Sequence, residues 1–239
     1  MSIYRNLDGF SDVAQSDPLG ALPFLDPTRW AVDFEDFLRY DLAQETGHYV
    51  LTQTNGVDTI AGPTGVLLLT LGGADNDVAE LQGAVAPWQT QTGKKLLYEA
   101  RVKVAKGAGG TIGQEELFFG LATIQTTTNF MNAGGTALAV DACMGFVSYD
   151  ASTSLSPVNR VADVESIEAG AASYADDTWM VLSLYHDGSS TKFYKDGTLL
   201  GDLAAEPTTV MTPTLFVKAG GAHAKVLHCD YYLVAAERG

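Results

Sequence analysis

Two Asp-Gly dipeptides, Asp187-Gly188 and Asp196-Gly197, divide the segment from Trp179 to Gly201 into three short runs rich in apolar residues. Asp-Gly suits tight hairpin turns, because glycine, and to a lesser degree aspartate, tolerates the positive φ that such turns need. The segment therefore predicts three short strands joined by two turns, an antiparallel meander. It indicates a fold class, but it contains no pattern that indicates a reaction.

Strand-like patterns continue through the chain from His48 onward. The clearest alternation lies in 97–104, where Glu99, Arg101 and Lys103 face one way and apolar residues face the other. Many short strands at fairly even spacing, separated by glycine-rich and Asn/Asp-rich turns, indicate an all-β sandwich. Strands are expected near 49–53, 65–71, 78–82, 95–104, 117–123, 137–140, 144–149, 160–167, 179–185, 191–195, 198–203, 213–218 and 225–235.

The N-terminal region lacks this alternation. Residues 1–32 contain three X-Pro pairs close together, and proline biases each preceding residue towards extended conformations. The segment is also too apolar for a plain solvated tail. It is expected to form an extended arm, and two interpretations stay open: the arm docks on a partner, or it lies on its own domain.

A short helix is expected to follow the arm. From Asp33 to Tyr40, Phe34, Phe37 and Leu38 share one helical face, and acidic residues fill the first turn. The chain is thus divided into an arm, a short helix with a linker, and a sandwich domain, over residues 1–32, 33–47 and 48–239.

Composition narrows the possible partners. The chain has 29 acidic against 14 basic residues and a formal net charge of −15. Such a surface repels nucleic acid and anionic lipid, so neither nucleic acid nor a membrane is expected as a partner. The sequence shows no run of about 18 apolar residues that could span a bilayer and no signal-peptide pattern, so a soluble protein made in a cytoplasm is expected. Cys143 and Cys229 are expected to be small buried hydrophobic residues, with a disulfide as the minority case.

The chain resembles the concanavalin A-like lectin/glucanase superfamily, a laminin-G-like jelly roll. Trp179-x-Val-Leu-Ser-Leu-Tyr-x-Asp-Gly, followed by the hairpin of 192–201, is similar to the family's tryptophan-led strand and its Tyr-x-Asp-Gly hairpin. The segment 229–234 is similar to the family's last strand. The resemblance covers roughly 48–236, and it implies a jelly-roll sandwich of two antiparallel sheets.

A second resemblance lies in 65–121, where 65–70, 75–82, 93–103 and 118–122 look like proteins encoded among bacteriophage structural genes. It implies a virion protein, made in the host cytoplasm, such as a capsid decoration (cement) protein or a fibre module. Its partners would be the major capsid protein or other virion proteins, and it would form a homo-oligomer, a trimer or a dimer. The resemblance carries over no functional residue.

Carboxylates are the first candidates for chemistry. Enzymes of the superfamily that cut β-glucans place alternate carboxylates on one strand, where period-two spacing puts them on one face. No such pattern is recognised in this sequence: Asp75-Asn76-Asp77 is expected to be a turn, with a calcium site as the alternative, and the adjacent Glu115 and Glu116 would point to opposite faces. No catalytic, cofactor or metal residue is therefore assigned.

Histidines and aromatic residues complete the search. Structural roles are expected for the histidines, with His186 in an exposed loop, and Trp179 is expected in the core. Candidate binding residues are Phe24, Trp30 and Trp88; Trp88 follows Pro87 in a loop, where a surface contact and a rim-packing role are equally supported.

Three functions follow in order. The first is a non-enzymatic structural protein of a bacteriophage particle, most simply a capsid decoration protein. The alternatives are a carbohydrate-binding module of a phage fibre or surface protein, and a glycoside hydrolase.

Overall fold

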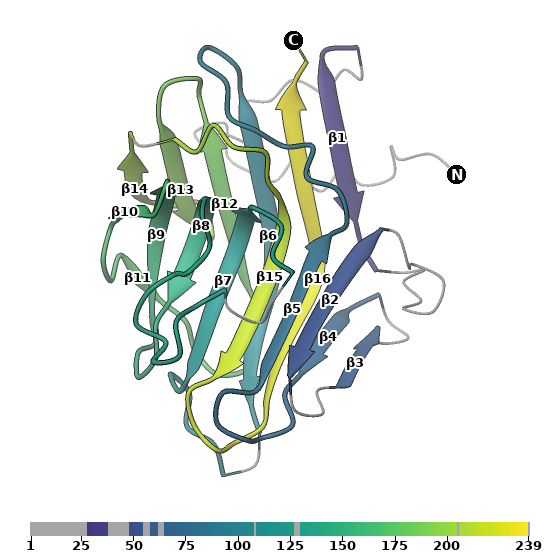
Figure 1. Ribbon diagram of the computed structural model, residues 1–239, viewed down its shortest axis with the longest axis vertical. Coiled ribbons are helices and arrows are strands. Elements are labelled where there is room, and N and C mark those ends of the chain that lie inside the picture. Colours follow the sequence, from purple (N-terminus) through teal and green to yellow (C-terminus); the bar gives the residue numbers. More distant parts are fainter. Residues whose placement is uncertain are drawn as a thin grey trace.

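The computed structural model is an all-β protein (Figure 1). It describes residues 28–37, 48–54, 58–61, 65–107, 109–126, 130–204 and 206–238, and no helix lies among them. The strands are β1 (Trp30–Glu35), β2 (Tyr49–Thr54), β3 (Asp58–Ala61), β4 (Leu67–Thr70), β5 (Val78–Gly83), β6 (Leu96–Lys106), β7 (Glu115–Ala122), β8 (Cys143–Ser148), β9 (Ser154–Val161), β10 (Val164–Ile167), β11 (Ala172–Ser173), β12 (Met180–His186), β13 (Thr191–Lys195), β14 (Thr198–Leu203), β15 (Thr212–Ala219) and β16 (Lys225–Glu237).

The strands form two antiparallel sheets that pack face to face. The first sheet has the order β14-β13-β12-β6-β16-β4-β3, with β1 also paired to β16. The second has the order β10-β9-β8-β7-β15-β5-β2, with β11 paired to β9. In Figure 1, β7 and β15 of the second sheet cross in front of β6 and β16 of the first. The predicted jelly-roll sandwich is confirmed.

The meander predicted from the two Asp-Gly pairs forms as expected. Asp196 and Gly197 have φ values of 49° and 77° and connect β13 directly to β14, with Lys195 opposite Thr198. At the other turn, Gly188 has a φ of 99°, and a Cβ there would lie 2.6 Å from the Cα of Gly93. A side chain at this turn would therefore clash with the neighbouring loop.

The core has two parts. The main part lies between the sheets, where Phe146 of one sheet meets Phe193 of the other edge to face, with ring centroids 5.5 Å apart. A second cluster lies on the outer face of β7, β8 and β15, covered by residues 130–142, and contains Phe118, Phe130 and Phe216. Both cysteines are buried free thiols, as predicted.

The helix predicted from Asp33 is wrong, because residues 30–35 form β1. This strand pairs with β16 from Trp30↔Glu237 to Glu35↔Tyr232. Its period-two pattern places Trp30 and Phe34 in one cluster with Leu97 and Leu233, and this burial outweighs a marginal helical pattern. Residues 1–27 and 38–47 lie outside the described residues, and the division into arm, linker and domain stays a prediction.

Two strand predictions also need correction. Residues 137–140 form only an isolated bridge, Leu138 to Met131. The stretch 160–167 turns back on itself between β9 and β10, at Ala162 and Asp163, which have φ values of 46° and 69°. The edge strands β1 and β3 were not predicted.

Glu115 and Glu116 point to opposite faces of β7, as predicted, and each meets a buried lysine. Lys225 Nζ lies 3.1 Å from Glu115 Oε2, with both side chains fully buried, and it donates to the carbonyl of Thr111. On the other face, Lys218 Nζ lies 2.7 Å from Glu116 Oε2. Each buried charge is thus paired, as burial requires.

Replacing Lys225 by methionine should lower the free energy of unfolding by about 3–5 kcal/mol, because it leaves the buried Glu115 carboxylate without its cation. Urea denaturation measures the loss. Lys106→Met is the matched control, because Lys106 lies opposite Lys225 in the sheet and its side chain is exposed; it should cost at most about 1 kcal/mol. Equal losses in the two variants would contradict the importance of the buried pair.

Glu80 on β5 is a buried carboxyl of a different kind. It is fully buried opposite Phe216, and neither of its carboxyl oxygens has a hydrogen-bond partner in the described part of the chain. Burial raises its pKa to about 8. The folded protein therefore keeps Glu80 protonated at a pH where the unfolded chain has released that proton.

This difference should make the protein less stable as the pH rises from about 4.5 to about 8, by at most about 5 kcal/mol from this one group. Glu80→Gln cannot ionise, so the variant should gain stability relative to the wild type across that window and not below it. Urea denaturation at pH 4.5, 6 and 8 measures the difference, with the exposed Glu168→Gln as control. A wild-type-to-variant difference that does not depend on pH would contradict the protonated Glu80.

Candidate functional site

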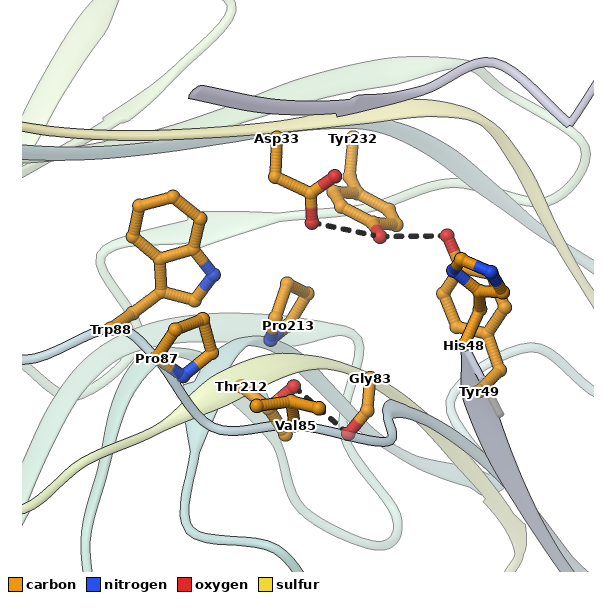
Figure 2. Close-up of a pocket in the computed structure, with 10 residues that line it drawn as sticks. All are labelled: Asp33, His48, Tyr49, Gly83, Val85, Pro87, Trp88, Thr212, Pro213 and Tyr232. Carbon is orange, nitrogen blue, oxygen red and sulfur yellow. Dashed lines mark hydrogen bonds between the residues drawn. The ribbon is translucent and has the colours of Figure 1, made fainter. Parts of the chain in front are cut away.

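A pocket opens between the two sheets at the edge where β1 and β16 face β2, β5 and β15. Its volume is about 180 Å³. The exposed residues His48, Val85 and Pro87 form its rim, and buried residues form its floor. The lining, drawn in Figure 2, comprises Asp33, His48, Tyr49, Gly83, Val85, Pro87, Trp88, Thr212, Pro213 and Tyr232.

A β-bulge in β16 turns Tyr232 into this pocket. The register of β16 against β6 shifts between Cys229 and Tyr231, which adds one residue and reverses the alternation of side chains. Before the bulge Cys229 faces the main core; after it, Tyr232 does. Tyr231 points to the outer face instead, where its hydroxyl donates to Glu99.

Two phenols link two carboxyl groups across the gap between the sheets. The hydroxyl oxygen of Tyr232 lies 3.3 Å from Asp33 Oδ2 and 2.8 Å from the hydroxyl oxygen of Tyr49. The Tyr49 hydroxyl lies 2.9 Å from Glu35 Oε2, whose Oε1 accepts from the backbone N–H of Phe37 at 2.6 Å. Since Tyr49 belongs to β2 and the other three to β1 and β16, the chain of contacts joins the two sheets.

Burial sets the protonation of these groups. Desolvation raises the pKa of Asp33, against smaller opposing effects of the Tyr232 hydrogen bond and of His48. Desolvation likewise raises the pKa of Glu35, against the hydrogen bonds from Phe37 and Tyr49. The pKa values of Tyr49 and Tyr232 are raised well above their usual range, mainly by burial, so both phenols keep their protons.

Trp88 forms the opposite wall. Its backbone makes a two-way bridge to Met211, donating to the Met211 carbonyl at 3.1 Å and accepting from its N–H at 2.6 Å. Figure 2 shows the indole across the pocket from His48 and Tyr49, with Asp33 between them. Pro87 and Pro213 extend the apolar wall. The pocket therefore combines one aromatic and apolar side with one polar side.

The predicted binding residues fall in three different places. Trp88 lines the pocket, although only 6% of its surface is exposed. Trp30 is buried in the cluster with Leu97 and Leu233, and Phe24 lies outside the described residues. The role of all three in binding stays a prediction.

Asp33 and Glu35 were missed because the sequence was interpreted as helical there. As a strand, Asp33-Phe34-Glu35 places both carboxyls on one face, so an alternating pair of carboxylates does exist in this chain. The signal that could have revealed it is the alternation of Trp30, Val32 and Phe34.

Three further residue predictions can be compared with the structure. His186 is fully buried in β12 and is not a loop residue. Trp179 is half-buried, with the Arg101 guanidinium 4.6 Å and Lys103 Nζ 5.1 Å from its ring centroid, so it lies outside the core. The segment 75–77 is a turn: Asn76 has a φ of 66°, and Asp77 accepts from the N–H of Ala74.

The described residues hold no group of three or more His, Cys, Asp or Glu arranged to bind a metal ion. No helix among them is long and apolar enough to cross a membrane.

The fold is shared with proteins that act on or bind carbohydrates. No family model matches the chain, and no curated protein matches it. An endo-1,3-beta-glucanase from Streptomyces sioyaensis is similar with a TM-score of 0.62 at 12% identity, over 90% of this chain and 99% of the other. The carbohydrate recognition domain of Emp46p is similar with a TM-score of 0.53 at 10% identity, over 83% and 93%. A protein of unknown function from Shewanella oneidensis has a TM-score of 0.58 at 13% identity, over 87% of each chain.

These neighbours correct two predictions. The prediction that the protein is not an enzyme is contradicted, because the shared fold is mostly that of endo-glucanases and a transglycosylase. Nothing in the comparisons points to a bacteriophage virion protein, so the carbohydrate-binding alternative now has the better support. At these identities the likeness concerns the fold.

Proposed function

We propose that this protein binds carbohydrate in the pocket beside Trp88. The observation that carries the proposal is the pairing of an aromatic wall with a polar wall inside one small cavity. A sugar ring has the same two sides: its C–H groups pack on an aromatic face, and its hydroxyls both donate and accept hydrogen bonds. The fold shared with glucanases and a carbohydrate recognition domain supports the same class of ligand.

The size and charge of the pocket narrow the ligand. A cavity of roughly 150 Å³ can hold one benzene molecule, and sites for drug-sized ligands measure roughly 300–1,000 Å³, so a volume of about 180 Å³ suits a single six-membered ring. Asp33 lines the pocket, and the chain carries a net charge of −15. A neutral sugar unit, such as the end of a glycan chain, therefore fits better than an anionic one.

Truncating Trp88 should remove binding, because the aromatic wall would be lost. On a glycan array, or by calorimetry with the neutral glycan that it identifies, Trp88→Ala should bind at least about tenfold more weakly, and Trp88→Phe should retain part of the affinity. Trp179→Ala is the control, because Trp179 lies on the outer face of the other sheet. Wild-type protein that binds no neutral glycan, or a Trp88→Ala variant with full affinity, would end the proposal.

The second candidate is a glycoside hydrolase, favoured by Asp33 and Glu35. Two residues along a strand span about 7 Å, within the range of about 5–10 Å that separates the paired carboxyls of glycosidases. A raised pKa suits a group that donates a proton to a leaving sugar. Only Asp33 lines the pocket, however, and Glu35 contacts it through the two tyrosines.

Incubation with neutral β-glucans tests this candidate by the reducing ends that are released. Asp33→Asn should lower the rate at least about hundredfold and leave affinity within a few fold, because the amide cannot donate an acidic proton. The exposed Asp163→Asn is the control. Absence of product with the wild type removes the hydrolase and leaves the binding proposal intact.

The virion location, the capsid partner and the trimer or dimer stay predictions. Mass spectrometry of purified particles and sedimentation of the isolated protein test them.

A further inference from the structure

The contacts between Asp33, Tyr232, Tyr49 and Glu35 need more protons than the two phenols can supply. Four oxygen atoms in a row make three contacts, of 3.3, 2.8 and 2.9 Å. Each contact needs one proton to be a hydrogen bond, and each phenol has one. The third proton must therefore come from a carboxyl group at one end of the row.

The two possible placements of that proton are mirror images. With the proton on Asp33, Asp33 donates to Tyr232, Tyr232 to Tyr49, and Tyr49 to ionised Glu35. With the proton on Glu35, every donor and acceptor reverses. If both carboxyls were ionised, one contact would bring two oxygen atoms together with no proton between them, which is repulsive in a buried site.

We propose that the pocket carries an acid–base site in which two carboxyl groups share one proton through two phenols, those of Asp33, Glu35, Tyr49 and Tyr232. Passing the proton along the row breaks three O–H bonds and forms three, so no charge beyond the single negative charge of the pair is created. Asp33 can then meet a ligand as a donor or as an acceptor, while Glu35 holds the compensating charge away from the pocket. The inference concerns the same pocket as the proposed function but needs no ligand.

The surroundings agree with a shared proton. Desolvation raises the pKa of both carboxyls, which favours keeping a proton on the pair at neutral pH. The other ionisable groups that act on the pair are His48, which lowers the pKa of Asp33, and Asp36, which raises the pKa of Glu35. The remaining neighbours from β15 and the 84–95 loop, Thr212, Pro213 and Trp88, do not ionise.

Carboxyl ¹³C NMR of the full chain tests the proposal without a ligand. In the wild type, the Asp33 and Glu35 signals should each show two steps, at the same two midpoints, because the two sites titrate as a pair. His48→Gln removes the nearby histidine titration and should leave both steps. Signals that each show one step, at unrelated midpoints, would overturn the proposal.

Variants separate the relay from simple repulsion between two nearby charges. Glu35→Gln offers an amide donor to Tyr49, so both phenol protons can point towards Asp33. The Asp33 carboxyl should then titrate in one step, at least about one pH unit below the upper wild-type step. The same substitution made in a Tyr49→Phe background should shift Asp33 by clearly less, since only through-space repulsion remains.

An equal shift of Asp33 in the two backgrounds would show that the phenols do not connect the carboxyls. Amide NMR spectra establish that each variant is folded. The two-step titration of the wild type remains decisive if Tyr49→Phe fails to fold. A failed relay with intact glycan binding, or the reverse, is distinguishable because the two experiments share no readout.

Discussion

The antiparallel pairing of β6 with β16 is the interaction on which the rest of the sandwich depends. It runs from Lys225↔Lys106 to Ala236↔Leu96, close to the full length of both strands. On its other side β16 pairs with β4 at 226–229 and with β1 at 232–237, while β6 also pairs with β12. Segments from both ends and the middle of the described chain are therefore placed by one pair of strands.

The bulge within that pairing also creates the pocket. Without the extra residue between Cys229 and Tyr231, the alternation along β16 would turn Tyr232 to the outer face and Tyr231 inward. With it, Tyr232 reaches Tyr49 of the opposite sheet, and β1 brings Asp33 and Glu35 to the same place. A local irregularity of one strand thus assembles polar groups from three strands at the open edge of the core.

What the sequence could predict follows from how local each signal is. The Asp-Gly turn at 196–197 needs positive φ at adjacent residues, and only a few residue types supply that cheaply, so the meander was predictable. The turn at Ala162-Asp163 uses the same geometry with less suitable residues and was missed. β1 was missed because its stability comes from β16, two hundred residues away. The bulge leaves no mark in composition, so the meeting of Tyr49 with Tyr232 could not be predicted.

Three buried carboxyl environments explain why the site lies where it does. Glu115 is neutralised by Lys225, so its charge is fixed and unavailable. Glu80 avoids the cost of burial by staying protonated against Phe216, away from the pocket. Asp33 and Glu35 have phenols as partners instead of a cation or an apolar surface, so neither charge nor proton is assigned permanently to one of them. Of these carboxyls, Asp33 alone lines the cavity, and the pair therefore combines an adjustable proton with access for a ligand.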